Sequence, residues 1–322
     1  MLIETSSLLV VVWALLFDAL IGDPDWLWRQ VPHPVALIGR GIAALERGLN
    51  QDAWPPLWRR LAGVAVVVLL VATAAVLGYA IEIAATGYVD EILTGLIASL
   101  FIAQRSLYQH VARVHDAFAG GGLDAARRAV GMIVGRHSKS LDAKGVCRAA
   151  IESCAENFSD GVIAPVLWLA LFGLPGLIVY KAINTADSMI GHRSARYRDF
   201  GWAAARLDDA VNFLPARLSG LLLALAAPFA DGSIAAALRT MRRDAGKHRS
   251  PNAGWPESAM AGALGLALAG PRRYAEGVVE DPYLNAEGRT EAVPNDIHRA
   301  LRILVAACAI EFVVYAALAL LF

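Results

Sequence analysis

The sequence has 322 residues, of which 57% are hydrophobic and only 18% charged, and its mean hydropathy is +0.49. Soluble domains are typically about 45–50% apolar and about 25% charged, so this composition is typical of a membrane protein. The 29 Lys and Arg residues balance the 29 Asp and Glu residues. Because the chain lacks the positive field that non-specific nucleic-acid binding requires, we expect no nucleic-acid partner.

Apolar segments recur along the whole chain. A helix needs about 20 apolar residues to cross a hydrocarbon core of about 30 Å, and residues 61–81 and 303–322 meet that length. We therefore predict an all-α, polytopic membrane protein with re-entrant or broken apolar helices, organised as one integral-membrane domain over 1–322. Its apolar segments lie near 7–22, 61–81, 87–103, 161–183, 214–229 and 303–322.

The segment 161–183 is interrupted by the sequence FGLPG at 172–176, a turn signal that would break a helix. Each half is then too short to cross a membrane, which indicates a re-entrant helical hairpin; one kinked span is the alternative. Segment 214–229 is similarly short and contains Pro215 and Pro228, so we do not expect a simple span there.

Lys and Arg are concentrated in the polar segments 23–60 and 104–160, whereas the connection after Ile81 has none before Arg105. By the positive-inside rule these two segments are cytoplasmic. The hairpin would return 184–213 to the same side, and 231–302 is also rich in Arg. We expect insertion in the cytoplasmic (inner) membrane, with cytoplasmic helical loops and a site facing the cytoplasm.

The densest polar stretch is IESCAENFSDG at 151–161. In a helix Glu152, Glu156 and Asp160 would lie four residues apart on one face, where their charges repel. Magnesium would relieve that repulsion, since it binds one or two carboxylates together with substrate phosphates. The alternative is a solvated acidic helix end. We predict a magnesium site at Glu152 and Glu156, joined by Asp187.

A second polar stripe follows the hairpin: Lys181, Asn184 and Asp187 recur at three-residue spacing beside an apolar run. Ionisable residues next to a membrane segment indicate function. Alternatively, Lys181 extends to the membrane interface and pairs with Asp187. The predicted catalytic residues are Glu152, Glu156, Asp160, Lys181 and Asp187.

Arginines are frequent after position 190. Arginine forks bind phosphate and carboxylate groups bidentately, so a substrate with several such groups is indicated, although such a cluster also suits membrane topology and anionic lipids. His33 and His248 lie in Pro-containing turns, where a structural role is the alternative. The predicted substrate-binding residues are His33, Asn157, Asn184, Arg193, Arg196, Tyr197, Arg206, Asp209, Asn212, His248 and Asn252.

With these residues in place, the sequence resembles the adenosylcobinamide-phosphate synthase family (CobD/CbiB) of cobalamin biosynthesis. The resemblance covers most of the chain outside 61–103. The sequence differs from the family pattern at two places: Ala269-Gly270-Pro271 stands where a glycine pair is expected, and Arg136-His137-Ser138 stands where Arg-Asp-Thr is typical. The blocks that carry the resemblance are, in order, GDP, HPV, ESCAENFSDGVIAP, YKAINTADSMIGH, RYRDFGWAAARLDDAVNFLPARL and SPNAGWPESAMAGALG.

The resemblance implies a carbon–nitrogen (acid–amine) ligase that joins aminopropanol phosphate to a propionate of adenosylcobyric acid, with ATP as a substrate and Mg²⁺ as cofactor. It implies small-molecule corrinoid and amine partners, membrane lipid, and contact with other late cobalamin-assembly enzymes. The alternative is a non-catalytic membrane sensor that resembles the AmpE-like regulators. A transporter ranks last, because no inverted repeats are visible.

Overall fold

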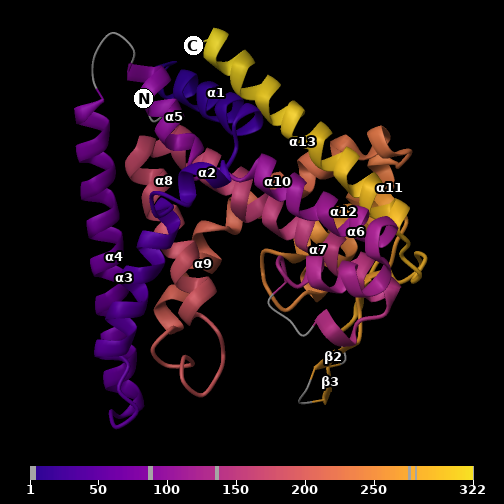
Figure 1. Cartoon of the computed structure of the whole chain (residues 1–322), viewed down its shortest axis with the longest axis horizontal. Helices are drawn as coiled ribbons and strands as arrows, with labels where there is room; N and C mark the ends of the chain where they lie inside the picture. Colours follow the sequence, from indigo (N-terminus) through magenta and orange to yellow (C-terminus); the bar gives the residue numbers. More distant parts are fainter. Residues whose placement is uncertain (1–4, 86–89, 135–137, 275–276, 280, 322) are drawn as a thin grey trace. The chain divides into compact units, whose positions relative to one another are not determined.

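The computed structural model describes residues 5–85, 90–134, 138–274, 277–279 and 281–321. The chain separates into two compact units, 1–103 with 164–212 and 315–322, and 104–163 with 213–314. The expected all-α class is confirmed, since helices dominate the described residues and the strands among them are only two or three residues long (Figure 1). That the chain is one membrane domain stays a prediction.

The first unit is built around α4 and α8, which pack against each other and against α9. Its core includes Ile42, Val66, Ile190 and Phe200. A Cβ on Gly78 would lie 2.6 Å from the Cα of Pro175, so the two backbones approach closely, as small residues allow in membrane proteins. The helices are α1 (Thr5–Leu20), α2 (Asp25–Trp28), α3 (Pro34–Leu49), α4 (Pro56–Ala84), α5 (Asp90–Ser99), α8 (Ala164–Ile190) and α9 (Trp202–Val211).

In the second unit α12 is the central element, because it packs against α7, α10 and α11 and most of its residues are buried. Strands β1 and β4 pair antiparallel, as do β2 and β3. The elements are α6 (Gln104–Val130), η1 (Ser138–Ser140), α7 (Ala143–Phe158), η2 (Ser159–Ile163), α10 (Phe213–Ala226), η3 (Ala227–Ala230), α11 (Ile234–Asp244), η4 (Ala245–Lys247), α12 (Gly254–Leu264), β1 (Leu268–Ala269), β2 (Arg272–Tyr274), β3 (Gly277–Val279), β4 (Tyr283–Leu284) and, up to residue 314, α13 (Pro294–Leu321).

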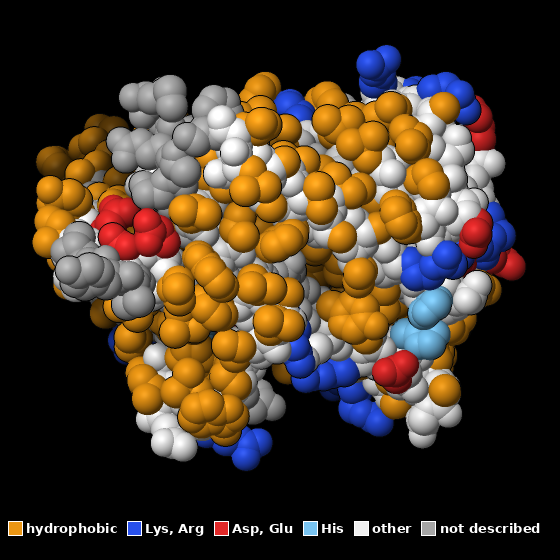
Figure 2. All heavy atoms as spheres, turned by 90° about the horizontal axis from the view of Figure 1, so that it is seen from above, with side chains coloured by type: hydrophobic (Ala, Val, Ile, Leu, Met, Phe, Trp, Pro, Cys, Tyr) orange, Lys and Arg blue, Asp and Glu red, His pale blue; other side chains and the backbone are white. Residues whose placement is uncertain are grey.

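Four stretches of helix are long and apolar enough to cross a membrane among the described residues: Pro56–Ala84, Ala143–Ile190, Phe213–Ala230 and Pro294–Leu321. Apolar side chains cover much of the face shown in Figure 2. Val68, Val76 and Leu77 of α4 are among the exposed apolar residues of the chain. Such exposure suits lipid contact better than water. Ser7–Leu20 is a shorter apolar helix. Residues 213–230 are long enough to span a membrane, contrary to our expectation for 214–229. Of the apolar segment predicted at 87–103, residues 87–89 lie outside the described part of the chain.

The break predicted at 172–176 is confirmed. Gly173 has a positive φ of 64°, which glycine adopts without a Cβ clash, and Phe172 is also non-helical. A Cβ on Gly176 would lie 2.5 Å from the carbonyl oxygen of Trp168, whereas residues eight apart in a continuous helix are separated by about 12 Å. The chain therefore folds back sharply, and the second arm runs to Ile190 rather than to 183. The depth of this hairpin in a membrane stays a prediction.

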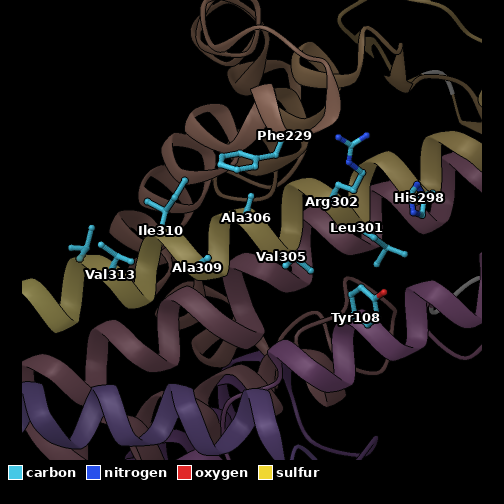
Figure 3. Close-up of a pocket in the computed structure, with 11 residues that line it drawn as sticks. Tyr108, Phe229, His298, Leu301, Arg302, Val305, Ala306, Ala309, Ile310 and Val313 are labelled. Carbon is cyan, nitrogen blue, oxygen red and sulfur yellow. The ribbon is translucent and has the colours of Figure 1, made fainter.

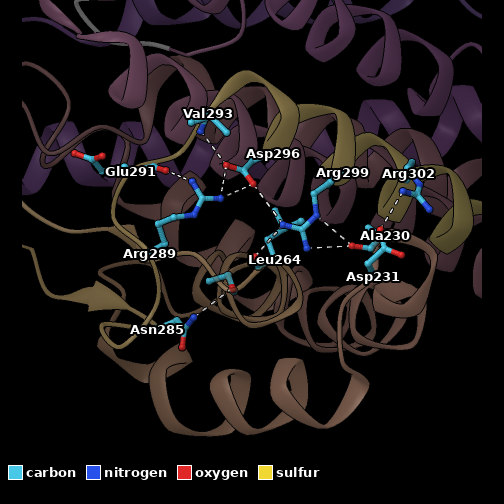
Figure 4. Close-up of polar contacts among 11 residues, drawn as sticks. Ala230, Asp231, Leu264, Asn285, Arg289, Glu291, Val293, Asp296, Arg299 and Arg302 are labelled. Carbon is cyan, nitrogen blue, oxygen red and sulfur yellow. Dashed lines mark hydrogen bonds and ion pairs between the residues drawn. The ribbon is translucent and has the colours of Figure 1, made fainter.

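Helix α13 begins at Pro294, well before the apolar segment expected from 303, so its first turns lie within the polar segment predicted to reach 302. Arg289 donates to both carboxylate oxygens of Asp296, each at 2.8 Å, and the backbone N–H of Val293 donates to the same carboxylate. Arg299 donates to the carbonyls of Ala230 and Leu264 (Figure 4). These contacts fix the start of the helix, where an acidic residue is also favoured by the helix dipole.

Candidate functional site

Two polar side chains of α8 contact residues of α9 and its C-terminal end. The Asn184 side-chain amide donates to Asp208 Oδ1 at 3.3 Å, and the Tyr180 hydroxyl donates to Asn212 Oδ1 at 3.0 Å. Ala204, Asp208 and Asn212 are four residues apart and so share one face of α9. Because Ala204 is small and buried, this face can approach α8 closely enough for the polar contacts to form.

Asp208 is the residue of this cluster with the most perturbed acidity. Burial, and next the negative charge of Asp187, raise the pKa of Asp208 to about 7, although hydrogen bonds with Asn184 and Asn212 act in the opposite direction. A partly buried carboxyl group beside a second acid is a place where positive charge is favoured. Asp187 and Asp208 are therefore the acid pair of this unit.

The position of Asp187 depends on the glycine that follows α8. The Gly191 N–H donates to the Asp187 carbonyl at 2.7 Å, and a Cβ on Gly191 would lie 1.9 Å from Asp187 Oδ1. No side chain larger than hydrogen fits between the carboxylate and this backbone. The YKAINTADSMIGH block thus includes a glycine for a steric reason.

Sequence reasoning had selected Asp209 rather than Asp208. Asp209 lies one residue further along α9 and pairs with Arg206 at 3.0 Å, and the Arg206 side chain is 51% exposed. The four-residue spacing from Ala204 to Asp208 to Asn212 was the signal that could have identified Asp208.

Arg196 forms an ion pair within the first unit: its guanidinium donates to Glu46 Oε1, at 2.8 Å from Nε, and that hydrogen bond raises the pKa of Arg196. Asn50 donates to the Arg196 carbonyl at 3.1 Å, and Arg59 donates to it as well. These bonds hold the segment after α8 against α3. Binding of phosphate by Arg196, by its half-buried neighbour Tyr197 or by the exposed Arg193 stays a prediction.

His33 caps the N-terminus of α3. Its Nδ1 accepts the N–H of Val35 at 3.2 Å, while Nε2 lies 3.3 Å from Asp23 Oδ1. Both nitrogens have partners in the turns GDP and HPV, so the structural role weighed from the sequence accounts for this histidine.

In the second unit the predicted carboxylate stack lies in three different environments. Glu152 is buried and accepts the backbone N–H of Ala269 at 2.7 Å, with Arg148 Nε at 3.9 Å. Glu156 and its neighbour Asn157 are exposed. Asp160 lies in the π-turn η2, where i→i+5 bonding ends the four-residue periodicity, so the stack does not extend to Asp160. Such turns are frequent at functional sites.

The loop before α12 holds the remaining predicted residues. His248 Nδ1 accepts the N–H of Ser250 at 3.0 Å, and its Nε2 lies 3.7 Å from the buried carboxylate of Glu257. Asn252 is buried, and its side-chain oxygen lies 3.4 Å from Arg217. These contacts order the loop at the start of α12.

No three His, Cys, Asp or Glu side chains gather into a potential metal site anywhere in the part of the chain that the structure describes. Magnesium in a phosphate-transferring enzyme needs only one or two carboxylates, because substrate phosphates supply other ligands. The acid pair Asp187 and Asp208, with the amide of Asn184, offers hard oxygen donors of this kind. Ligation by Glu152, Glu156 and Asp187 together stays a prediction, since the first two belong to the other unit.

Comparison with known proteins shows the family to which the chain belongs. A family model described as CobD/Cbib protein matches residues 11–304. A Sinorhizobium fredii protein is 51% identical over 93% of both chains. A Brucella suis protein is 51% identical over 92% of this chain and 91% of its own, and one from Rhodobacter capsulatus 49% over 91% of both. Each is named cobalamin biosynthesis protein CobD. No solved structure matches.

Proposed function

Because this chain belongs to the CobD/CbiB family of cobalamin biosynthesis proteins, we propose that it is an adenosylcobinamide-phosphate synthase. The reaction joins the amine of aminopropanol phosphate to a propionate carboxylate of adenosylcobyric acid and consumes ATP. We place it in the cytoplasmic membrane with the site facing the cytoplasm, as the Lys and Arg distribution indicates.

The observation that carries the proposal is the acid pair between α8 and α9. A carboxylate is a poor electrophile and must first be phosphorylated by ATP, a transfer whose charge has to be balanced by cations. Asp208 has a pKa of about 7 beside Asp187, so this position favours a bound cation. Both residues lie in blocks that carry the family resemblance.

Asp187, Asp208 and the Asn184 amide oxygen would hold magnesium, which supplies charge neutralisation at the transferring phosphoryl group. Lys181 precedes Asn184 and Asp187 on α8 and would contact phosphate from the same helix. Arg206 is half exposed on α9 and Arg193 is exposed after α8. Both would bind phosphate oxygens of ATP or of the amine substrate.

Polar groups of the second unit have proposed roles in the same reaction. Asp160, in the π-turn, and the exposed Glu156 and Asn157 are candidates for binding the amine and taking its proton. Glu152 holds Ala269 and would keep this segment in place. The ordered loop with His248 and Asn252 would contact the corrinoid.

The test is product formation by the purified, detergent-solubilised protein given adenosylcobyric acid, aminopropanol phosphate and magnesium-ATP. We expect a new corrinoid amide, with ADP and phosphate formed in equal amounts, that disappears when ATP or magnesium is omitted. A folded protein that forms no amide under these conditions would contradict the proposal and favour the sensor.

A further inference from the structure

An open groove of about 660 Å³ lies in the second unit along one side of α13. Its walls include Phe229 of η3 and Val305, Ala309 and Ile310 of α13, all apolar. In Figure 3 Arg302, His298 and Tyr108 of α6 lie toward one end of the groove, with Arg302 and Tyr108 on opposite sides of α13 in this view, and Val313 lies at the other end. The groove therefore has one polar end and one apolar end.

The dimensions match one leaflet of a bilayer. From His298 to Val314 the helix rises about 24 Å, and one leaflet with its headgroups is roughly 20–22 Å thick. The polar end falls where the apolar part of Pro294–Leu321, a candidate span, begins. An amphiphile with a headgroup at Arg302 and a hydrocarbon tail toward Val314 would match both the length and the polarity of the groove.

The charge of Arg302 is available for such a headgroup. Its guanidinium lies 3.4 Å from Asp231, but the two side chains are 46% and 81% exposed. An ion pair this exposed contributes little and exchanges readily. A guanidinium binds phosphate in a bidentate fashion, and the imidazole of His298 and the hydroxyl of Tyr108 can donate further hydrogen bonds.

We propose that this groove binds an anionic phospholipid, with its phosphate at Arg302 and one acyl chain along α13 toward Val314. The proposal goes beyond the ligase activity and does not depend on it. An apolar wall without hydrogen-bond partners disfavours a polar solute along the groove, whereas the single cationic end selects an anionic headgroup.

Native mass spectrometry of the delipidated full chain with added phosphatidylglycerol or phosphatidylcholine tests the proposal. We expect phosphatidylglycerol to bind better. Arg302→Gln should weaken its binding roughly fivefold, the contribution of one arginine near a membrane surface, and that of phosphatidylcholine less, because the choline cation already offsets part of the attraction to Arg302. Ala309→Trp, at an exposed position within the groove, should weaken binding of both lipids by roughly tenfold or more because it fills the space for the tail.

Two variants serve as matched controls: Arg242→Gln, at an exposed arginine of α11, and Val76→Trp, at a 67% exposed residue of α4. Both should bind lipid as the unaltered chain does, and unchanged thermal midpoints would show that all four variants fold. Equal phosphatidylglycerol binding by all four would overturn the proposal. Displacement of the lipid by inorganic phosphate would also overturn it, because it would indicate a site for free phosphate. A dimer that carries no lipid would overturn it as well, because a second copy of the chain would then cover the groove.

Discussion

Asp208 of the first unit is partly buried and Asp244 of the second is fully buried, and their pKa values move in opposite directions. Burial and the neighbouring Asp187 raise the pKa of Asp208 to about 7. Burial also tends to raise the pKa of Asp244, but hydrogen bonds from Arg243, Lys247 and the Asn285 N–H outweigh it and lower the pKa to about 2.

The difference lies in the partners. Asp244 is completely buried with Lys247 Nζ at 2.7 Å and Arg243 Nη2 at 3.0 Å, so its charge is compensated within the protein. Asp208 has the amides of Asn184 and Asn212 and the acids Asp187 and Asp209 as neighbours, and none of the interactions that set its pKa comes from a positive charge. A buried carboxylate that the fold itself satisfies is structural, whereas one that the fold leaves short of positive charge is a candidate for binding a cation.

The largest expected effect is on activity. Asp208→Asn should lower the ligase rate at least about 100-fold, because it removes a charge from the proposed magnesium site, where even indirect partners contribute about 10–100-fold. Amide formation at saturating ATP measures it across a magnesium titration. Asp124→Asn, at a 79% exposed side chain on α6, is the control and should be fully active. A greater loss of ligase rate in Asp209→Asn than in Asp208→Asn would mean that Asp209, the residue predicted from the sequence, and not Asp208 belongs to the site.

Asp244 should instead matter for stability. Asp244→Ala removes the buried acceptor shared by Arg243, Lys247 and the Asn285 N–H and should lower the free energy of unfolding by about 2–3 kcal/mol. The thermal midpoint in detergent measures the change. Asp116→Ala, at a 77% exposed side chain within α6 of the same unit, should lower the free energy of unfolding by less than about 1 kcal/mol. Equal losses of stability in the two variants would mean that the buried carboxylate of Asp244 contributes no more to stability than an exposed one.

The same contrast predicts a pH dependence in the absence of magnesium. Between pH 4 and pH 7 folded Asp208 keeps a proton that the unfolded chain releases, so the free energy of unfolding falls as pH rises through this window. From pH 5 to pH 8 the loss due to Asp208 is roughly 2 kcal/mol. Thermal midpoints at both values, with a chelator, should show this loss in the unaltered chain and not in Asp208→Asn. Identical slopes in the two proteins would exclude a raised pKa at Asp208.

Local sequence signals account for much of the fold. The apolar runs predicted the helices, and FGLPG predicted the break at Gly173, because both depend on residues close together in the chain. The start of α13 was missed, since ion pairs with Arg289 set it and not hydrophobicity. The length of 213–230, sufficient for a span, was also missed, because Pro215 and Pro228 were given too much weight: Pro215 lies within α10, and Pro228 lies in η3, which continues it.

The sequence identified the motifs that contain the candidate site residues, but not which of these side chains contact one another. The polar stripe on α8 was visible in its spacing, whereas the choice between Asp208 and Asp209 depended on which face of α9 meets α8. The bond between Glu152 and Ala269 joins residues 117 positions apart, and no periodicity reports such a contact. Arg136 and His137, where the chain departs from the family pattern, lie outside the described residues.

The smallest expected effect concerns Ala269, which donates its N–H to Glu152 and stands where the family resemblance leads us to expect the first glycine of a pair. Ala269 has a positive φ of 56° and Gly270 one of 79°, and an alanine in this conformation costs about 1 kcal/mol. Ala269→Gly should therefore raise the free energy of unfolding by somewhat less than about 1 kcal/mol, because the added freedom of the unfolded chain offsets part of the gain. The thermal midpoint measures it, with Ala235→Gly on the exposed side of α11 as the destabilising control. A lower midpoint for Ala269→Gly would mean that the alanine methyl group packs well enough to outweigh the strain, and that Glu152 holds this turn for reasons other than its backbone conformation.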